Sequence, residues 1–193
     1  MLKKQPNIII RFFGHLNNIL THKYWVFVCC CKIGMPIRGI LHDMSKFHPI
    51  EFWEGVHYYH DRHSSPINYA KKDKGYSKAW FHHRNHNKHH YEHWMDNFDQ
   101  GGENILMPYK YAQEMLCDYI GAGIAYNGKT NIYQNELIWW NNRLKNPIAM
   151  HPALQAFVTD CLTYMADTEH FIPKEKAIQY YCLETSSYKE TSL

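Results

Sequence analysis

Apolar residues recur along nearly the whole chain at the spacing of an amphipathic helix, and no long alternation of apolar and polar residues interrupts them. This periodicity predicts helices over residues 7–21, 22–34, 36–46, 49–60, 77–96, 108–127, 132–145 and 152–167. Prolines stand where four of these helices begin, which is the helix position that proline tolerates best: Pro36, Pro49, Pro108 and Pro152. The pattern therefore predicts an all-α fold, a compact helical bundle.

Two segments between the predicted helices are expected to form long loops. Residues 61–76 are polar and carry turn formers and a run of charges, and residues 97–106 contain a Gly-Gly pair. Long loops in a compact domain are often functional. We expect a single domain over residues 1–183 and a flexible C-terminal tail over residues 184–193. At the start of the helix over 49–60, Glu51 is expected to fold back on the first turn.

The composition of the 193 residues narrows the function classes. Hydrophobic residues are 45% and charged residues 20%, which excludes wholesale disorder. The formal net charge of +3 gives no strong nucleic-acid signal. Fifteen histidines stand out because they outnumber the glycines and the prolines and because they are clustered. Histidines that bind a cation must stay neutral, so this count is not latent positive charge.

Six cysteines are present without a C-x-x-C pair, and three of them are consecutive at residues 29–31. We interpret them as reduced thiols that fill small core positions, which indicates a reducing compartment. The apolar stretch over residues 24–31 is bounded by Lys23 and Lys32 and is far too short to span a membrane. With no targeting segment recognised either, a cytoplasmic protein without a membrane partner is expected.

The strongest local signal is the run Leu41-His42-Asp43-Met44-Ser45-Lys46-Phe47. Its His-Asp pair offers two side chains that bind metals from one turn of backbone, provided that the turn directs both inward, as at a helix end. A plain surface helix end is the alternative interpretation.

A second signal lies between Phe81 and Trp94, where six imidazoles occur within twelve residues: His82, His83, His86, His89, His90 and His93. On an unbroken helix, four of them would share one stripe. Asn87 could instead cap a fresh helix, which would leave His82 and His83 before the break and His89 and His90 after it. Either arrangement brings imidazoles together, and two or three of them are expected to be ligands. The alternative is a solvated or hydrogen-bonded histidine-rich face.

Two further residues complete the candidate set. Asp118 stands in an otherwise apolar run, so it needs a buried partner, either a cation or a salt bridge to Lys110 or Arg38. Glu114, one turn earlier, is expected to be exposed or to support a ligand. His22 lies at the junction of the first two predicted helices, and His15 lies two turns before it.

The order His22, His42-Asp43, His82/His83, His89/His90, Asp118 resembles the HD superfamily of helical metalloproteins. His42-Asp-Met-Ser-Lys46 is similar to the His-Asp-x-Gly-Lys variant of that superfamily, with serine in place of glycine. Over about residues 15–125 the chain also resembles an uncharacterised family of bacteria and phages. That likeness is carried by His-Asp-x-Ser-Lys-Phe-x3-Glu-Phe, His-His-x3-Asn-x-His-His-x-Glu and Glu-Met-x2-Asp-x-Ile-Gly-Ala-Gly.

The resemblance to the HD superfamily implies an HD-domain-like fold with one or two divalent metal ions. By that match His22, His42, Asp43 and Asp118 hold one ion, and Asp43 bridges to a second ion held by His83 with His89 or His90. His82 is kept among the candidate ligands. The sequence does not distinguish Mn, Fe, Mg, Ni and Zn.

The function expected from this resemblance is metal-dependent hydrolysis of a phosphate ester, in a nucleotide or nucleotide-derived molecule. Asp43, Lys46 and Glu51 are the candidate catalytic residues, and Arg84 and Lys88 are candidates to bind phosphate oxygens. Solvated surface charge is the alternative interpretation for Lys46, Arg84 and Lys88. Two alternative functions are an HD-like di-iron oxygenase and a protein that sequesters a nucleotide without turnover. A structural role without metal and a homo-oligomer are left open.

Overall fold

The computed structural model describes residues 6–96, 99 and 101–186. Among the described residues the regular secondary structure is helical apart from one isolated bridge between Met95 and Asn104, so the prediction of a compact all-α fold is confirmed. Two short 3-10 helices, η1 (Met44–Phe47) and η2 (Tyr91–Trp94), accompany the α-helices. The α-helices are α1 (Ile8–Lys32), α2 (Pro36–Leu41), α3 (Pro49–His57), α4 (Pro66–Lys74), α5 (Lys78–His86), α6 (Tyr109–Asn127), α7 (Ile132–Leu144), α8 (Pro152–Thr168) and α9 (Lys174–Thr185).

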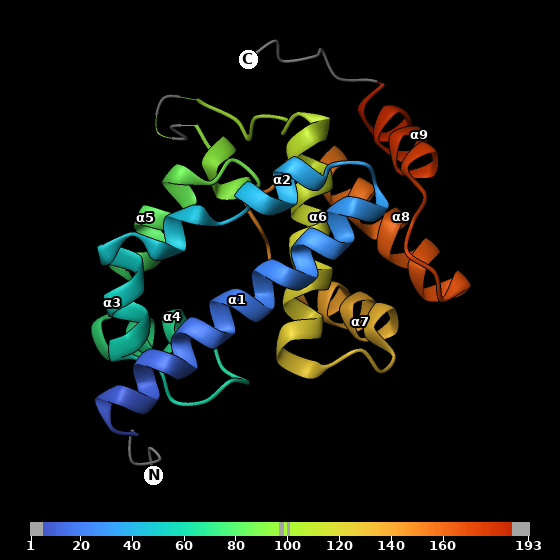
Figure 1. Cartoon of the computed structure of the whole chain (residues 1–193). Helices are drawn as coiled ribbons and strands as arrows, with labels where there is room; N and C mark the ends of the chain where they lie inside the picture. Colours follow the sequence, from blue (N-terminus) through green and yellow to red (C-terminus); the bar gives the residue numbers. More distant parts are fainter. Residues whose placement is uncertain (1–5, 97–98, 100, 187–193) are drawn as a thin grey trace.

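Helices α1 and α6 form the centre of the molecule and cross one another (Figure 1). Helices α3 to α5 lie toward one side of this pair, α7 to α9 lie toward the other, and α2 overlaps α6 in this view (Figure 1). The largest apolar cluster is built from the C-terminal half of α1 together with α6 to α9. Among its buried members are Val26, Met115, Leu116, Ile120, Trp140, Leu154, Phe157, Leu162 and Met165.

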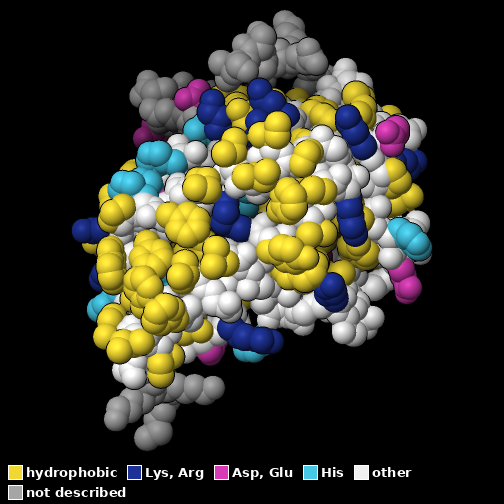
Figure 2. Space-filling model, viewed as in Figure 1, with side chains coloured by type: hydrophobic (Ala, Val, Ile, Leu, Met, Phe, Trp, Pro, Cys, Tyr) yellow, Lys and Arg dark blue, Asp and Glu magenta, His cyan; other side chains and the backbone are white. Residues whose placement is uncertain are grey.

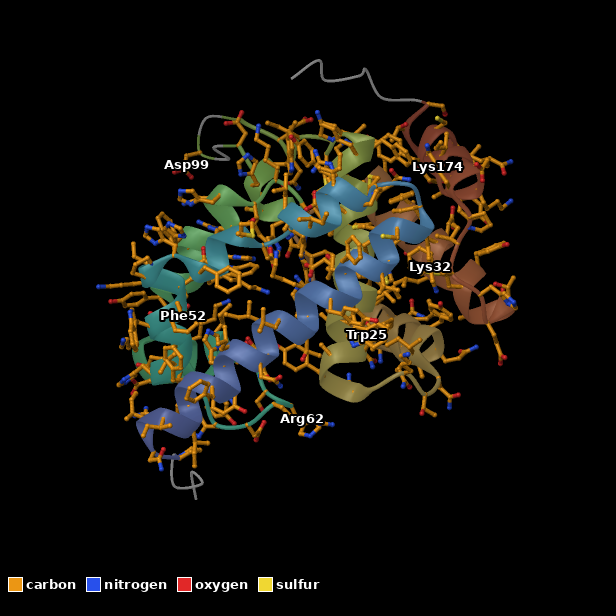
Figure 3. All side chains as sticks on the ribbon, viewed as in Figure 1. Trp25, Lys32, Phe52, Arg62, Asp99 and Lys174 are labelled. Atoms are coloured by element: carbon orange, nitrogen blue, oxygen red, sulfur yellow. The ribbon has the colours of Figure 1, made fainter. Side chains whose placement is uncertain are left out.

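The part of α1 beside this core is anchored by two cation–aromatic contacts. Trp25 and Lys32 are labelled there in Figure 3. The Lys129 Nζ lies 4.2 Å from the centre of the Trp25 ring, and the Lys32 Nζ lies 5.3 Å from the centre of the Phe171 ring. Contacts of this kind contribute about 0.5–1 kcal/mol each at exposed sites, so their contribution to stability is small.

A glycine allows α1 and α6 to approach closely. A Cβ atom built on Gly121 would lie 2.5 Å from Val26 Cγ2 and 2.8 Å from the Val26 backbone nitrogen. Any larger residue would force the two helices apart. Because Asp118 lies one turn before Gly121 and His22 one turn before Val26, the same close approach brings their side chains together.

The first helix differs from the prediction. A break between residues 21 and 22 was expected, but α1 runs without interruption from Ile8 to Lys32. Neither Thr21 nor His22 is a helix breaker, and Asn7 caps the start by accepting a hydrogen bond of 2.9 Å from Ile10 N. His22 consequently lies in the middle of a helix, on its buried face with Ile19 and Val26.

The predicted helices over 36–46 and 77–96 are both shorter than expected. The first ends at Leu41, because Asp43 adopts a left-handed conformation with φ 54° and ψ 31°. The second ends at His86, and Asn87 is its C-cap, with its backbone N–H bonded to the His83 carbonyl. Both interruptions place candidate ligands in irregular backbone, where neighbouring side chains can point to the same place.

Two helices lie where none was predicted. The segment 61–76, expected to be a loop, contains α4, which begins at Pro66 and ends at Gly75 with φ 80°. Helix α9 covers residues 174–185 and so enters the predicted tail, whose residues 187–193 lie outside the described part. The predicted loop over 97–106 is described except for residues 97, 98 and 100.

All six cysteines are free thiols. Cys29, Cys30, Cys117 and Cys161 are buried as the core interpretation predicts, whereas Cys31 and Cys182 are exposed. In the described residues, no helix combines the length and the apolar character needed to cross a membrane.

Hydrophobic side chains gather on the face that α1, α2 and α3 present in Figure 2. More than half of each of several large side chains is exposed there, including Ile9, Phe13, Ile37, Leu41 and Trp53. Contiguous apolar faces are typical of surfaces that contact another molecule. The homo-oligomer left open by the sequence stays a prediction.

Glu136 of α7 is a buried acid beside the α6 backbone, where a Cβ built on Gly123 would lie 2.0 Å from Glu136 Oε1. Burial, and then the charge of Asp118, raises the pKa of Glu136 to about 7. The folded protein thus holds this proton more tightly than the unfolded chain, and stability falls as pH rises from about 4.5 to about 7.

We expect Glu136→Gln to stabilise the fold by up to about 3 kcal/mol at pH 8 and to change little near pH 4. Urea unfolding at the two pH values measures this. The exposed Glu175 offers a matched control, because Glu175→Gln should leave stability unchanged at both values. Equal effects of Glu136→Gln at the two pH values would contradict the assignment.

Candidate metal centre

Donor side chains from five segments meet between α1, α5 and α6. His22 comes from α1, the His42-Asp43 pair from the turn after α2, and Asp118 from α6. His83 lies in the last turn of α5, and His89 and His90 follow that helix. All of these residues except His90 are less than a tenth exposed. The convergence expected from the sequence is therefore present for these seven residues.

The first group consists of His22, His42, Asp43 and Asp118. His22 Nε2 lies 3.2 Å from Asp43 Oδ2 and 3.1 Å from Asp118 Oδ1. His42 Nε2 lies 3.3 Å from the same Asp43 oxygen and 3.5 Å from the same Asp118 oxygen. Ligands about 2.1 Å from one cation lie about 3.0–3.4 Å apart in octahedral or tetrahedral geometry. The spacing of the four atoms therefore fits a common cation.

The second group consists of Asp43, His83, His89 and His90. His83 Nε2 and His89 Nε2 each lie 3.3 Å from Asp43 Oδ1. The ligand atoms of all four residues lie within 4.8 Å of one another. Three imidazoles and one carboxylate form a donor set that suits divalent transition metals.

Asp43 belongs to both groups, because its Oδ2 faces the first and its Oδ1 faces the second. The left-handed backbone at Asp43 is uncommon for a residue other than glycine and costs about 1–3 kcal/mol, which is typical of functional sites. Lys23 on α1 holds the turn by donating to the carbonyls of Ile40 and His42. The helix that carries His22 thus also fixes the His-Asp turn.

Two further carboxylates orient the imidazole rings through contacts with their Nδ1 atoms. Glu114 Oε1 lies 3.1 Å from His42 Nδ1 and 3.3 Å from His89 Nδ1, and Arg38 holds the other Glu114 oxygen at 2.5 Å. Glu51 Oε2 lies 2.7 Å from His83 Nδ1. Carboxylates that accept the Nδ1–H of a histidine leave its Nε2 lone pair for a metal.

A second observation, independent of the spacing of the ligand atoms, also indicates that these residues fit a bound cation. With Nδ1 protonated, the Nε2 atoms of His42, His83 and His89 all point lone pairs at the centre. Among the described residues, no hydrogen-bond partner exists for three buried atoms of the second group: Asp43 Oδ1, His89 Nε2 and His90 Nε2. A buried polar atom without a partner is costly, and a shared cation would satisfy all three.

The charges at the centre also favour a cation. Burial alone would raise the pKa of Asp43, but the charges of His42 and Lys46 hold it well below its usual range. Burial alone would also raise the pKa of Asp118, but hydrogen bonds from His22 and His42 hold this pKa well below its usual range. Burial and the neighbouring imidazoles hold the pKa of His90 well below its usual range, so this ring stays neutral. Burial would lower the pKa of His42, but Asp43 and Asp118 raise it well above its usual range, so a bound cation would displace a proton from this ring.

Three of the candidate ligands and phosphate-binding residues lie outside the two groups. His82 Nδ1 lies 2.6 Å from Glu51, and its ring stacks on His48 and His86. Arg84 lies over the Phe81 ring in a separate surface hollow. The structure therefore corrects the expectation for these two, because α5 directs His83 inward and its neighbours outward. Lys88 lines a groove on the other side of the centre, together with Arg38 and Tyr111.

The structure also decides the roles of three acids. Glu51 does not cap its own helix, because its carboxylate lies against His82 and His83. Asp118 faces His22 and His42. The salt bridge from Asp118 to Arg38, which the sequence left as an alternative, is therefore wrong, because Arg38 pairs with Glu114. Glu114 is buried and supports two rings, the second of the two roles that the sequence left open.

Sequence reasoning missed the network that holds His83. The Asn87 side chain donates to Ser45 Oγ at 2.7 Å and to the His83 carbonyl at 2.8 Å, and Ser45 Oγ lies 3.2 Å from His83 Nδ1. The serine that follows the His-Asp pair by two positions thus contacts a candidate ligand. The sequence feature that could have revealed this network is the polar Ser45 itself.

One family model, that of the family of unknown function DUF5662, matches residues 11–164. The chain belongs to this family. All the residues of both groups, from His22 to Asp118, lie within the DUF5662 match. No curated protein and no solved structure matches the chain.

We expect protein purified without a nickel column to hold about two divalent ions per chain, because each group offers four ligands. Asp118→Ala should leave about one ion and Asp43→Ala should remove both, since only Asp43 serves both groups. Elemental analysis measures the content. His86→Ala is the matched control from the same histidine-rich stretch. Wild-type metal content in Asp43→Ala would contradict a shared centre.

Glu114→Gln should weaken metal binding by roughly 10- to 100-fold, because His42 and His89 lose the charged acceptor that aligns them. Competition with a chelating dye measures the affinity. The exposed Glu103 provides the control Glu103→Gln, which should bind metal as the wild type does. Unchanged affinity in Glu114→Gln would exclude the orienting role.

Proposed function

We propose that this protein is a metal-dependent phosphohydrolase of the HD type that cleaves a phosphate monoester at the Asp43 centre. The observation that carries the proposal is the carboxylate of Asp43 facing two separate donor groups. Adjacent pairs of cations are the arrangement that serves phosphoryl transfer, since they contact both the attacking and the leaving oxygen.

A cavity of about 190 Å³ adjoins the centre and supports the proposal. Five candidate ligands line it, namely His22, Asp43, His83, His90 and Asp118. Its other walls come from α1, α3, α4, α5 and α6 and include Ile19, Ile67, Ala79, Trp80 and Ala122. Apolar walls with a few polar groups at one end are typical of substrate pockets.

Lys46 brings a positive charge to this cavity. Its Nζ lies 2.7 Å from Asp43 Oδ2, and burial would lower its pKa, but Asp43 raises it above the usual range. Lys46 is therefore charged at neutral pH. An ammonium group at this position can bind a phosphoryl oxygen of the substrate and stabilise the charge that develops during reaction.

The reaction we propose is hydrolysis. A water oxygen forms a bond to phosphorus, the bond between phosphorus and the ester oxygen breaks, and one proton of the water passes to the leaving oxygen. The products are an alcohol and inorganic phosphate. Divalent cations at such a centre lower the pKa of a bound water toward 7 and neutralise phosphoryl charge. Glu51 and Glu114 keep the imidazoles aligned, as positioning residues.

A second candidate function is a di-iron oxygenase, favoured by the three imidazoles of the second group. The two functions separate experimentally: copurified iron with substrate-dependent oxygen uptake supports the oxygenase. Phosphate release without oxygen uptake supports the hydrolase. Tight retention of a nucleotide without turnover would instead support the sequestering protein considered from the sequence.

We expect the metal-loaded protein to release phosphate from members of a phosphate monoester panel. His42→Ala should abolish this release, because it removes a ligand of the first group. Lys46→Ala should lower kcat by roughly 100-fold while metal content is kept, because it removes only the charge at the phosphoryl oxygen. Phosphate release and elemental analysis are measured on the same samples. Undiminished release by His42→Ala would contradict the proposal.

A further inference from the structure

The outer side of α1 is apolar, although it faces away from the rest of the molecule. Four large side chains recur on this side at helical spacing, and each is more than half exposed: Ile9, Phe13, Leu20 and Tyr24. The opposite side of the helix is buried and carries His22 of the metal centre. Surface helices normally turn polar side chains outward. A helix that is apolar on both sides therefore indicates that something other than water covers its outer side.

The apolar side of α1 continues over the next three elements of the chain. Thirteen of the nineteen large apolar side chains that are exposed in the described residues belong to α1, α2, η1 and α3. These elements pack against one another, so their exposed side chains form one surface, which is seen from outside in Figure 2. We call the thirteen side chains, which lie within residues 8–53, the apolar face.

The apolar face is larger than the apolar surface of most monomers. An aromatic side chain has about 150–250 Å² of surface, so Phe13 at 62% exposure and Trp53 at 55% together expose about 200 Å². At only about 60 Å² each, the other eleven side chains bring the total to about 850 Å². The largest apolar patch on a typical monomer covers about 300–600 Å². Stable interfaces bury about 800 Å² per partner, so the area is sufficient for docking.

Contacts between aromatic rings hold this face in shape. The Phe12 ring of α1 lies 5.2 Å from the Phe52 ring and 6.0 Å from the Trp53 ring, both on α3. Phe52 is labelled in Figure 3. The Phe13 ring lies 5.3 Å from the Phe12 ring, edge to face. The exposed rings Phe13 and Trp53 are thus fixed relative to each other before any partner binds.

The segment that forms most of the face carries an excess of positive charge. The first 42 residues contain six Lys or Arg and no Asp or Glu. The rest of the chain holds 18 Asp or Glu and only 15 Lys or Arg. One of the six cations, Arg38, is neutralised by Glu114 of α6. The excess remains without it.

The cations lie among the apolar side chains, and the acids do not. Lys23 lies between α1 and the end of α2, where it donates to backbone carbonyls, and Lys32 is exposed at the end of α1. Glu51 and Glu54 of α3 point instead toward α5, where both accept hydrogen bonds. In Figure 2, Lys and Arg side chains lie between the apolar ones, whereas Asp and Glu are visible only toward the edges.

A bilayer of anionic lipids matches this combination better than a second copy of the chain does. Two copies that met through this face would bring two cationic surfaces together, and like charges oppose such a contact. A protein interface also carries about one hydrogen bond per 100–200 Å², and the apolar face offers few groups for them. Acyl chains require no hydrogen-bond partners, and anionic headgroups attract nearby lysines.

We propose that the protein docks on the surface of an anionic lipid bilayer through the apolar face. Helix α1 lies in the plane of the bilayer, and its outer side chains enter the boundary between headgroups and acyl chains, to a depth of about 5–10 Å. Lys23 and Lys32 lie at the level of the lipid phosphates, and Trp53 suits the same depth. The sequence alone indicates no membrane partner, because this surface exists only where α1, α2 and α3 meet in the fold.

Flotation of the full chain with lipid vesicles tests the docking. One set of vesicles contains equal parts of phosphatidylglycerol and phosphatidylcholine, and the other contains phosphatidylcholine alone. We expect the affinity for the anionic vesicles to be at least about tenfold higher, and to fall at high salt. No ester is present, so the result does not depend on the proposed hydrolase. Absence of binding to the anionic vesicles, or equal binding to both sets, would overturn the inference.

Phe13→Asp should lower the affinity for anionic vesicles by at least about tenfold, because an inserted ring is replaced by a charge that the lipids repel. Ile37→Asp changes α2 instead, apart from the ring contacts of Phe13, and should have a similar effect. Ile138→Asp is the matched control, since Ile138 is 58% exposed on α7, outside the face. All three melting temperatures should stay within about 2 °C of the wild-type value. An equal loss of binding in Ile138→Asp would contradict docking through this face.

Tryptophan fluorescence locates the contact. Anionic vesicles should shift the emission to shorter wavelength, because the exposed Trp53 leaves water. Trp53→Phe should lose this shift, and Trp139→Phe should keep it, since the exposed Trp139 lies on α7. A shift that only Trp139→Phe removes would overturn the inference. Ultracentrifugation without vesicles should find a monomer, whereas a dimer that Phe13→Asp dissociates would assign the face to a second copy instead.

Discussion

The two oxygens of a single buried carboxylate, on Asp43, face two different sets of donors, and the surrounding helices are arranged to make this sharing possible. A buried anion must be compensated by partners within a few ångströms, since its desolvation costs several kcal/mol. Here the partners come from α1, from α5 and the segment after it, and from Lys46 of η1. The left-handed turn at Asp43 is the local cost of presenting both oxygens at once.

The second requirement is that each imidazole keeps its orientation. Glu114 serves two rings, one in each group, and is itself held by Arg38. Glu51, with Ser45 and Asn87, holds His83. This support makes the centre rigid, but it buries charges that contribute little to stability. The apolar cluster of α6 to α9 lies directly beside it and supplies the hydrophobic stabilisation that the polar centre lacks.

The α1–α6 pair links these two parts of the molecule. One face of α1 carries His15, Asn18 and His22, and further along the same helix Val26 and Cys30 enter the core. Helix α6 likewise carries Asp118 toward the centre and Ile120 toward the core. The close contact at Gly121 therefore sets both the packing of the core and the geometry of the first donor group.

The sequence by itself determined the helical class, most helix positions, and the candidate ligands His22, His42, Asp43 and Asp118. The helices follow from local signals, because periodicity and helix-starting prolines act over a few residues. The ligand set was instead implied by the resemblance to the HD superfamily. Two short polar helices were missed: α4 was taken for a loop and α9 was not predicted, because their apolar pattern is weak. The continuity of α1 was missed because a histidine was taken for a junction.

Only the tertiary structure decided which members of the histidine-rich stretch face the centre. His82 and His83 are adjacent and chemically identical, and both contact Glu51, yet only His83 also faces Asp43. That choice depends on how α5 lies against α3 and η1, which are distant in the chain. Packing between elements likewise decided the surroundings of Glu114, Arg38 and Asn18. A side chain's partners are set by packing between elements, and spacing along one element cannot specify them.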